Sequence, residues 1–351
     1  MWYKTHTIRQ QEYIMQTKKP NLFLKYILPG ALISGALTAV IGLTAANLSG
    51  FQIVGHTVAF AYPWRLTEPN AIAHLTAWGG YLLHNIIAWV IIYFAQREKP
   101  KYGNDLRWFN WAMIGTNIAF GLIHVVQTQY FYDGLAQSVP EITALGSVAV
   151  MLMIIIILET PRRGLIFGYK FKFKDEFMYI VRKYHSYIFT WAIIYDYWYH
   201  PTVGTFGHLM GFYYNFLIMV QATLLFNRAH LNKWWTVFLE VFVLIHAVAV
   251  AIFQGQTMWP MFAFGFGAMI VLTQMYGLGL NTWTKRGLAI GFLILVVAFY
   301  TSTGHIAGLN EVIRIPMIDY LVIFLLYGIY LGINWIINLF KRPEITPAPA
   351  D

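Results

Sequence analysis

The residues best suited to chemistry in this sequence are its histidines, of which there are eleven. Histidine is costly in the hydrocarbon of a membrane unless its ring is paired, hydrated or bound to a metal. A one-sided set of histidines therefore predicts a buried polar centre, such as a heme or metal site near the outer surface. Seven fall in the predicted loops and span halves that face away from the cytoplasm, namely His56, His74, His124, His200, His208, His246 and His305.

The closest spacing of possible metal ligands is that of Asp196 and His200. They are four residues apart, so they share one face of a helix. Together with His208 they could form a carboxylate–histidine metal site, or Asp196 could only orient the ring of His200. The alternative interpretation of this segment is structural. The aromatic residues at 195 and 197–199 could form a belt at the membrane surface.

Four further histidines are candidate ligands on other predicted helices. His74 and His305 are the candidates for binding a cofactor, and His124 and His246 are candidates for a metal. The alternative for the last two is a hydrogen bond to a neighbouring carbonyl group, because buried polar groups usually find such a partner. His84 follows His74 by ten residues, so the two lie about 15 Å apart along a helix and cannot share one ion.

Several other kinds of chemistry are excluded by what the sequence lacks. It has no cysteine, which excludes disulfides, Cys-ligated iron–sulfur clusters and thiol catalysis. It has no His-Glu-x-x-His motif, no Gly-x-Ser-x-Gly elbow and no Walker loop, so the usual zinc protease, hydrolase and nucleotide sites are not predicted.

The composition places these residues in a membrane protein. Of 351 residues, 58% are hydrophobic and 11% are charged, and the mean hydropathy is +0.54. A soluble domain of this length needs far less apolar surface, so the sequence predicts an all-α, polytopic integral membrane helical bundle. The net charge of +9 does not indicate nucleic acid, because the basic residues are spread over the ends of the predicted spans.

Apolar runs of about 20 residues predict about ten transmembrane helices. The chain then divides into a cytoplasmic N-terminal segment (1–22), a transmembrane helical domain (23–340) and a disordered C-terminal tail (341–351). Apart from Arg65 and Arg314, the basic residues near the spans lie in the predicted inner segments. Both termini are therefore expected in the cytoplasm, and the expected location is a plasma (inner) membrane. The predicted spans are about 23–48, 70–95, 108–132, 140–158, 181–199, 206–226, 234–253, 258–279, 286–302 and 317–340.

Short echoes in the sequence predict an internal repeat of four helices. Segment 121–124 resembles 243–246, 163–169 resembles 286–292, and 207–209 resembles 304–306. The members of each pair are four predicted spans apart, and the pairs follow one another in the same order. Such a repeat would place His74, His208 and His305 at the outer ends of equivalent helices.

Several of these segments resemble the large subunit of the heme–copper oxidase and nitric oxide reductase superfamily. Residues 65–74, followed by the glycines at 79–80, are similar to the heme-binding segment of that family's second helix. Residues 206–208 look like the metal-binding segment of its sixth helix, and residues 303–305 resemble its tenth-helix segment. The family's fold arranges its helices in arcs of four, which would agree with the predicted repeat.

This resemblance implies a redox function. His74 and His305 would be the axial ligands of a heme b, and His208 and His246 would bind a second metal, copper or iron. Quinol is the implied electron donor, and other membrane subunits are implied partners. The sequence departs from the family at Thr303, where a histidine is expected, and at the seventh helix, which has one histidine instead of two. It also lacks two spans, and together these departures favour a heme-only or cofactor-poor relative over one that reduces oxygen.

Three other functions are compatible with the sequence, so whether the protein is an enzyme stays open. A transporter of small solutes or ions would explain the repeat and the polar residues Asn117, Asn215, Gln221 and Glu240 within spans. A non-catalytic subunit of a larger membrane complex would explain the many aromatic residues. A metal-dependent enzyme acting on lipid would use the 196, 200 and 208 side chains.

Overall fold

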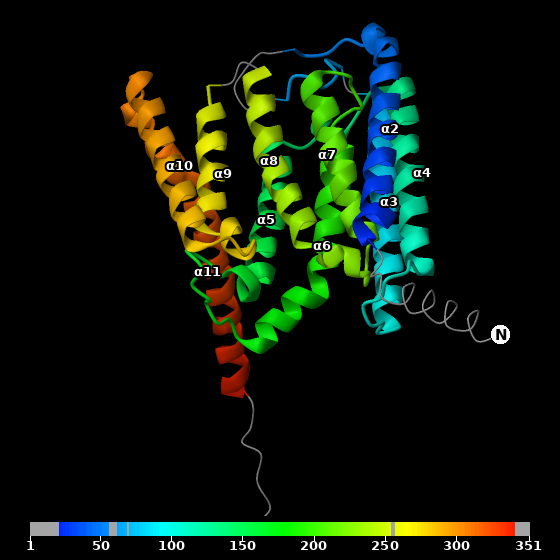
Figure 1. The fold of residues 1–351 in the computed structure, drawn as a ribbon. Coiled ribbons are helices and arrows are strands. Elements are labelled where there is room, and N and C mark those ends of the chain that lie inside the picture. The colour runs from blue at the N-terminus through cyan, green and yellow to red at the C-terminus, as the bar shows by residue number, and fades with distance from the viewer. Residues whose placement is uncertain (1–20, 56–61, 69, 254–256, 341–351) are drawn as a thin grey trace, which may run out of the picture. The chain divides into compact units, whose positions relative to one another are not determined.

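The computed structural model describes residues 21–340, except 56–61, 69 and 254–256. The predictions for residues 1–20, His56 and the C-terminal tail lie outside the described residues. Within them the chain is all-helical with ten α-helices (Figure 1), which confirms the predicted fold class. The helices are α2 (Leu28–Thr44), α3 (Ala71–Arg97), α4 (Trp108–Phe131), α5 (Glu141–Arg163), α6 (Asp175–Tyr199), α7 (Phe206–Thr223), α8 (Lys233–Phe253), α9 (Trp259–Leu272), α10 (Thr282–Ser302) and α11 (Glu311–Phe340).

Each helix falls on one of the predicted apolar runs, and eight helical segments in the described residues are long and apolar enough to cross a membrane. The protein is therefore an integral membrane helical bundle. Helices α6 and α7 are not among the eight. The reason is their polar content, since α6 contains Arg182, Lys183 and His185 within its length, and α7 contains His208, Asn215 and Gln221.

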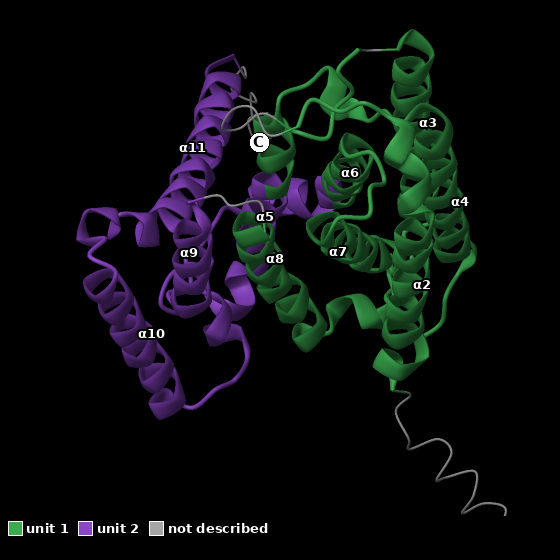
Figure 2. Ribbon diagram, turned by 90° about the horizontal axis from the view of Figure 1, so that it is seen from above, with its two compact units in different colours: residues 1–148, 186–254 green, residues 149–185, 255–351 purple. Residues whose placement is uncertain are grey.

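The chain divides into two compact units (Figure 2). Unit 1 consists of residues 1–148 and 186–254, and unit 2 consists of residues 149–185 and 255–351. In unit 1, α3 packs against α4, and α7 packs against both α2 and α8. In unit 2, α9 packs against α11 and α10. Five of the seven predicted site residues are on α4, α6, α7 and α8 or directly after α6, all within unit 1.

Glycines allow the close helix contacts of unit 1. A Cβ atom on Gly30 of α2 would lie 2.6 Å from Cγ1 of Val220 on α7. A Cβ atom on Gly80 of α3 would overlap the indole ring of Trp198 on α6, which is fully buried. Small residues at such crossings are typical of membrane helices, because packing rather than hydrophobicity drives their association.

Unit 2 contains an apolar core that includes Leu152, Ile156, Phe173, Met269 and Ile323. Residues 164–174, which join α5 to α6, begin with a compact turn. In this turn Leu165 N–H donates to the carbonyl of Tyr169 at 2.8 Å, and two glycines have positive φ. The predicted counterpart of segment 163–169, segment 286–292, is helical. That pair of echoes differs in conformation, and the four-helix repeat stays a prediction.

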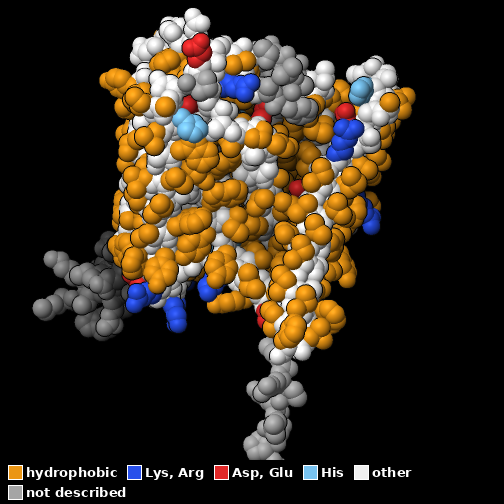
Figure 3. All heavy atoms as spheres, turned by 180° about the vertical axis from the view of Figure 1, so that it is seen from behind, with side chains coloured by type: hydrophobic (Ala, Val, Ile, Leu, Met, Phe, Trp, Pro, Cys, Tyr) orange, Lys and Arg blue, Asp and Glu red, His pale blue; other side chains and the backbone are white. Residues whose placement is uncertain are grey.

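Hydrophobic side chains cover most of the visible face of the molecule (Figure 3). The exposed hydrophobic side chains of α10 and α11 include Leu293, Ile294, Leu321 and Trp335, each more than half exposed. This surface suits contact with lipid tails, as the predicted bilayer partner requires. The choice of membrane and the cytoplasmic placement of the termini stay predictions.

The contact between Gly80 and Trp198 can be tested with a neighbouring glycine as control. We expect Gly80→Ala to destabilise the protein by about 1–3 kcal/mol, because the added methyl group overpacks a buried ring. Gly79→Ala should have a much smaller effect, since nothing lies within 4 Å of a Cβ atom at that position. Thermal unfolding of the purified protein in detergent measures both, and equal midpoints for the two variants would contradict this packing.

Candidate functional site

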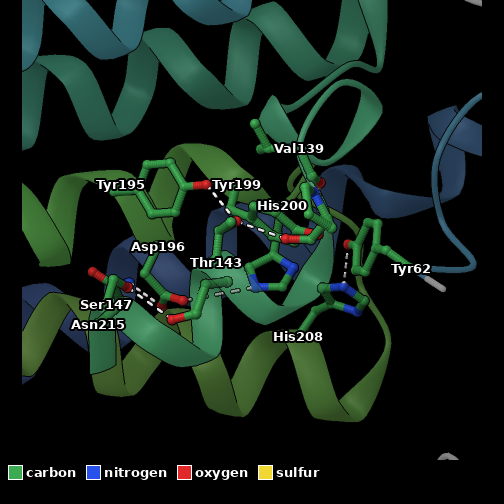
Figure 4. Close-up of polar contacts among 12 residues, drawn as sticks. Tyr62, Val139, Thr143, Ser147, Tyr195, Asp196, Tyr199, His200, His208 and Asn215 are labelled. Atoms are coloured by element: carbon green, nitrogen blue, oxygen red, sulfur yellow. Dashed lines mark hydrogen bonds and ion pairs between the residues drawn. The ribbon is translucent and has the colours of Figure 1, made fainter. Parts of the chain in front are cut away.

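The candidate site is a polar cluster in unit 1 at the end of α6 and the start of α7 (Figure 4). Asp196 is on the last turn of α6, and His200 directly follows that helix. His208 is on the first turn of α7, and Tyr62 comes from the segment between η2 (Ala45–Gly50) and α3. The structure therefore brings three of the predicted metal-binding residues together, although His200 lies just beyond the end of α6 and not on the same helix as Asp196.

Helix α4 fixes the point at which α6 ends. Nε2 of His124 donates a hydrogen bond to the carbonyl oxygen of His200 at 2.8 Å. One turn further along α4, the hydroxyl of Thr128 accepts from the backbone N–H of Thr202 at 3.1 Å. Nδ1 of His124 lies 3.1 Å from the side-chain amide of Gln127. Both ring nitrogens of His124 thus have partners, and its role is to position the backbone at His200.

His208 is held between two hydroxyl groups. Its Nε2 atom lies 2.7 Å from the hydroxyl oxygen of Tyr62, and its Nδ1 atom lies 2.6 Å from Oγ1 of Thr205. Because a neutral imidazole has one donor and one acceptor nitrogen, one hydroxyl must donate to the ring and the other must accept from it. Both nitrogens are therefore occupied, and a metal could bind His208 only if one of these bonds broke.

His200 and Asp196 are close but not in direct hydrogen-bond contact. Nε2 of His200 is 4.0 Å from Oδ1 of Asp196, which is too long for a hydrogen bond. The other carboxylate oxygen of Asp196 accepts from Nδ2 of Asn215 at 2.8 Å. Nδ1 of His200 is buried and has no hydrogen-bond partner among the described residues. The ring of His200 is packed among the rings of Tyr62, Tyr199 and His208.

His246 on α8 approaches the cluster across a glycine of α7. A Cβ atom on Gly211 would lie 3.0 Å from Cε1 of His246 and 3.4 Å from its Nε2 atom. The ring therefore packs directly against the backbone of α7. Its Nδ1 atom is buried and, within the described part of the chain, without a hydrogen-bond partner.

The two predicted heme ligands lie outside this cluster. His74 is partly exposed on the first turn of α3, with its ring 6.1 Å from that of Trp78. His305 belongs to unit 2, where its side chain is 56% exposed and its Nε2 atom is 3.7 Å from Oε1 of Glu311. It precedes α11, as the sequence indicated. A heme bound by this pair stays a prediction.

Sequence reasoning missed several partners that complete the cluster. Tyr62 and Thr205 were not identified, because loop residues show no periodicity that would place them near a histidine. His84 was read only as too distant from His74 to share an ion. Its ring has a partner at each nitrogen, since Nδ1 accepts from the indole N–H of Trp198 at 3.3 Å and Nε2 lies 3.1 Å from Oδ1 of Asn117.

The described residues contain no group of three or more His, Asp or Glu side chains arranged as a ready metal site. Searches of family models, of curated proteins and of solved structures find no match to this chain. The resemblance to the heme–copper oxidase superfamily therefore stays a prediction from short motifs, and the function must be argued from the side chains themselves.

A carboxyl group near His74 makes the stability of the protein depend on pH. Asp133, in the loop after α4, is 2% exposed. Its Oδ1 atom accepts from the N–H of Gly134 at 2.8 Å, but Oδ2 has no partner among the described residues. Burial raises the pKa of Asp133 to about 6, against the smaller opposing effects of the Gly134 N–H and the charge of His74.

Because the folded state raises this pKa from 3.8 to about 6, it holds the proton more tightly than the unfolded state. Stability should therefore fall as the pH rises through this range and stay lower above it. We expect Asp133→Asn to raise the thermal midpoint at neutral pH and to flatten its pH dependence. The exposed Glu68→Gln serves as control, and an unchanged pH profile in Asp133→Asn would contradict this assignment.

Proposed function

We propose that this protein binds a transition metal ion within the membrane, through Asp196, His200 and His246. The observation that supports this most strongly is the pair of buried Nδ1 atoms on His200 and His246 that lack a hydrogen-bond partner among the described residues. Leaving a polar atom buried without a partner costs about 1–3 kcal/mol. Coordination to a metal ion would satisfy Nδ1 of His246. On His200 the nitrogen nearest Asp196 is Nε2, so an ion between these two side chains would bind Nε2 and leave Nδ1 without a partner.

The spacing of the nearest pair agrees with this proposal. Nε2 of His200 and Oδ1 of Asp196 are 4.0 Å apart. Metal–ligand bonds to nitrogen and oxygen are about 2.0–2.2 Å long, so two donor atoms on opposite sides of one ion are separated by about 4 Å. A histidine ligand binds a metal ion through the lone pair of its neutral ring. Asn215 would orient the Asp196 carboxylate from behind.

The donor set narrows the choice of metal. Two imidazoles and one carboxylate suit zinc, iron or manganese, and imidazole also suits copper. The absence of cysteine removes the thiolate that would select copper(I). Iron or copper in this position would support the redox role implied by the resemblance, with a membrane-soluble donor such as quinol. Zinc would instead indicate a structural or hydrolytic role.

The proposal is tested by the metal content of the purified protein. We expect a stoichiometric transition metal by elemental analysis, and cobalt(II) added to the chelated protein should give visible absorption from nitrogen and oxygen ligands. Asp196→Asn and His246→Ala should remove both signals. Asn215→Ala should weaken cobalt binding by about 10- to 100-fold, because it acts on a ligand and not on the ion.

The matched control is His74→Ala, which removes a histidine outside the cluster and should leave metal binding unchanged. The same variant tests the heme prediction, since it would abolish a heme absorption band if His74 were an axial ligand. If the correctly folded protein contains no transition metal and does not bind cobalt(II), the proposal is overturned. Transport of a small solute or ion would then be the better-supported function.

A further inference from the structure

A second polar group without a partner lies in unit 2, on α11. The fully buried or nearly buried residues of this helix are Pro316, Asp319 and Ile323. Their spacing of three and four residues places them on one face. Asp319 is 3% exposed and lies about 12 Å along the helix axis from Glu311, at 1.5 Å per residue. It belongs to the long apolar helical segment Ile306–Phe340 and lies near the start of the predicted span 317–340.

This face of α11 packs against α9. A Cβ atom on Gly265 of α9 would lie 2.8 Å from Cδ1 of Ile315, one turn before Asp319. Ile323, one turn after it, shares an apolar core with Met269 of α9. Asp319 thus stands between two apolar contacts. The sequence of α9, Trp259–Leu272, contains no titratable side chain at all.

Among the described residues, the structure shows no ion pair to the carboxyl group of Asp319. Oδ2 of Asp319 has no hydrogen-bond partner among the described residues. The adjacent Tyr320 uses its hydroxyl to donate to the carbonyl of Leu165 at 3.0 Å. Arg163, at the end of α5, is a buried cation of the same unit. Near the start of α11, Arg314 donates to Oδ1 of Asn310 at 3.1 Å, and His305 faces Glu311.

A carboxylate at this position would have one buried oxygen, Oδ2, without a hydrogen-bond partner among the described residues. Its transfer from water into an apolar medium costs far more than the transfer of the neutral acid, so a buried carboxyl group takes up a proton instead of keeping its charge. Ionisable residues inside a membrane are rare and often take part in proton transfer. The group is not needed for packing, because an apolar side chain would fill the same space at lower cost.

We propose that Asp319 is a proton-binding site in unit 2, at which a neutral carboxylic acid holds a proton inside the membrane at neutral pH. This site is independent of the metal site proposed in unit 1, since it shares no residue with it. The ligand is a proton, and binding it converts the carboxylate to the acid without any other reactant.

The protonation state can be read directly by infrared spectroscopy of the full chain in lipid. We expect a carbonyl band of a protonated carboxylic acid at neutral pH, and we expect Asp319→Asn to lack that component. Asp319→Glu should retain a shifted band. The exposed Asp175 provides the control, because Asp175→Asn should leave the band unchanged at neutral pH.

If the Asp319 variants fold poorly, their thermal unfolding midpoints still test the proposal. Replacing a neutral acid by a neutral amide should leave the thermal midpoint at neutral pH unchanged or raise it, whereas loss of an ion-paired carboxylate would lower it. The proposal is overturned if the wild-type band of Asp319 appears only at acidic pH. It is also overturned if both Asp319→Asn and Asp319→Leu unfold the protein, because the carboxylate would then be required for stability. Loss of the band with retained stability supports it.

Discussion

The architecture of unit 1 depends on one constraint, which is that a polar atom in a membrane interior must find its partner within the protein. The hydrogen bond from His124 to the carbonyl oxygen of His200 meets this constraint where α6 ends. Trp198, two residues before His200, donates to His84 and covers Gly80. Helices α3, α4 and α6 are thus joined by polar contacts as well as by close packing.

The same constraint separates the histidines into two groups. His84, His124 and His208 have a partner at each ring nitrogen, and these partners explain why the rings are buried. His200 and His246 each leave one buried nitrogen without a partner in the described residues. The two groups differ in what their rings can bind. A ring with a hydrogen bond at each nitrogen serves to hold the structure together, whereas a ring with an unpaired nitrogen can still bind a ligand.

Much of the fold could be predicted from sequence, and much of the site could not. Apolar runs located all ten helices, because the length of a span is set by the thickness of the bilayer. They could not show that Tyr62 of a loop would reach His208, or that Asp196 and His200 would be 4.0 Å apart. Short motifs grouped His74 with His305, whereas the structure places these residues in different compact units. Helical spacing alone carries no information on which helices are neighbours.

The bond between His124 and His200 has a further consequence for how this protein can evolve. The acceptor is a backbone oxygen, which every amino acid provides. The anchor at the end of α6 therefore survives any substitution at position 200 that keeps the local conformation. The bond itself therefore sets no requirement on the side chain at position 200, whose chemistry is set instead by the aromatic rings packed around it.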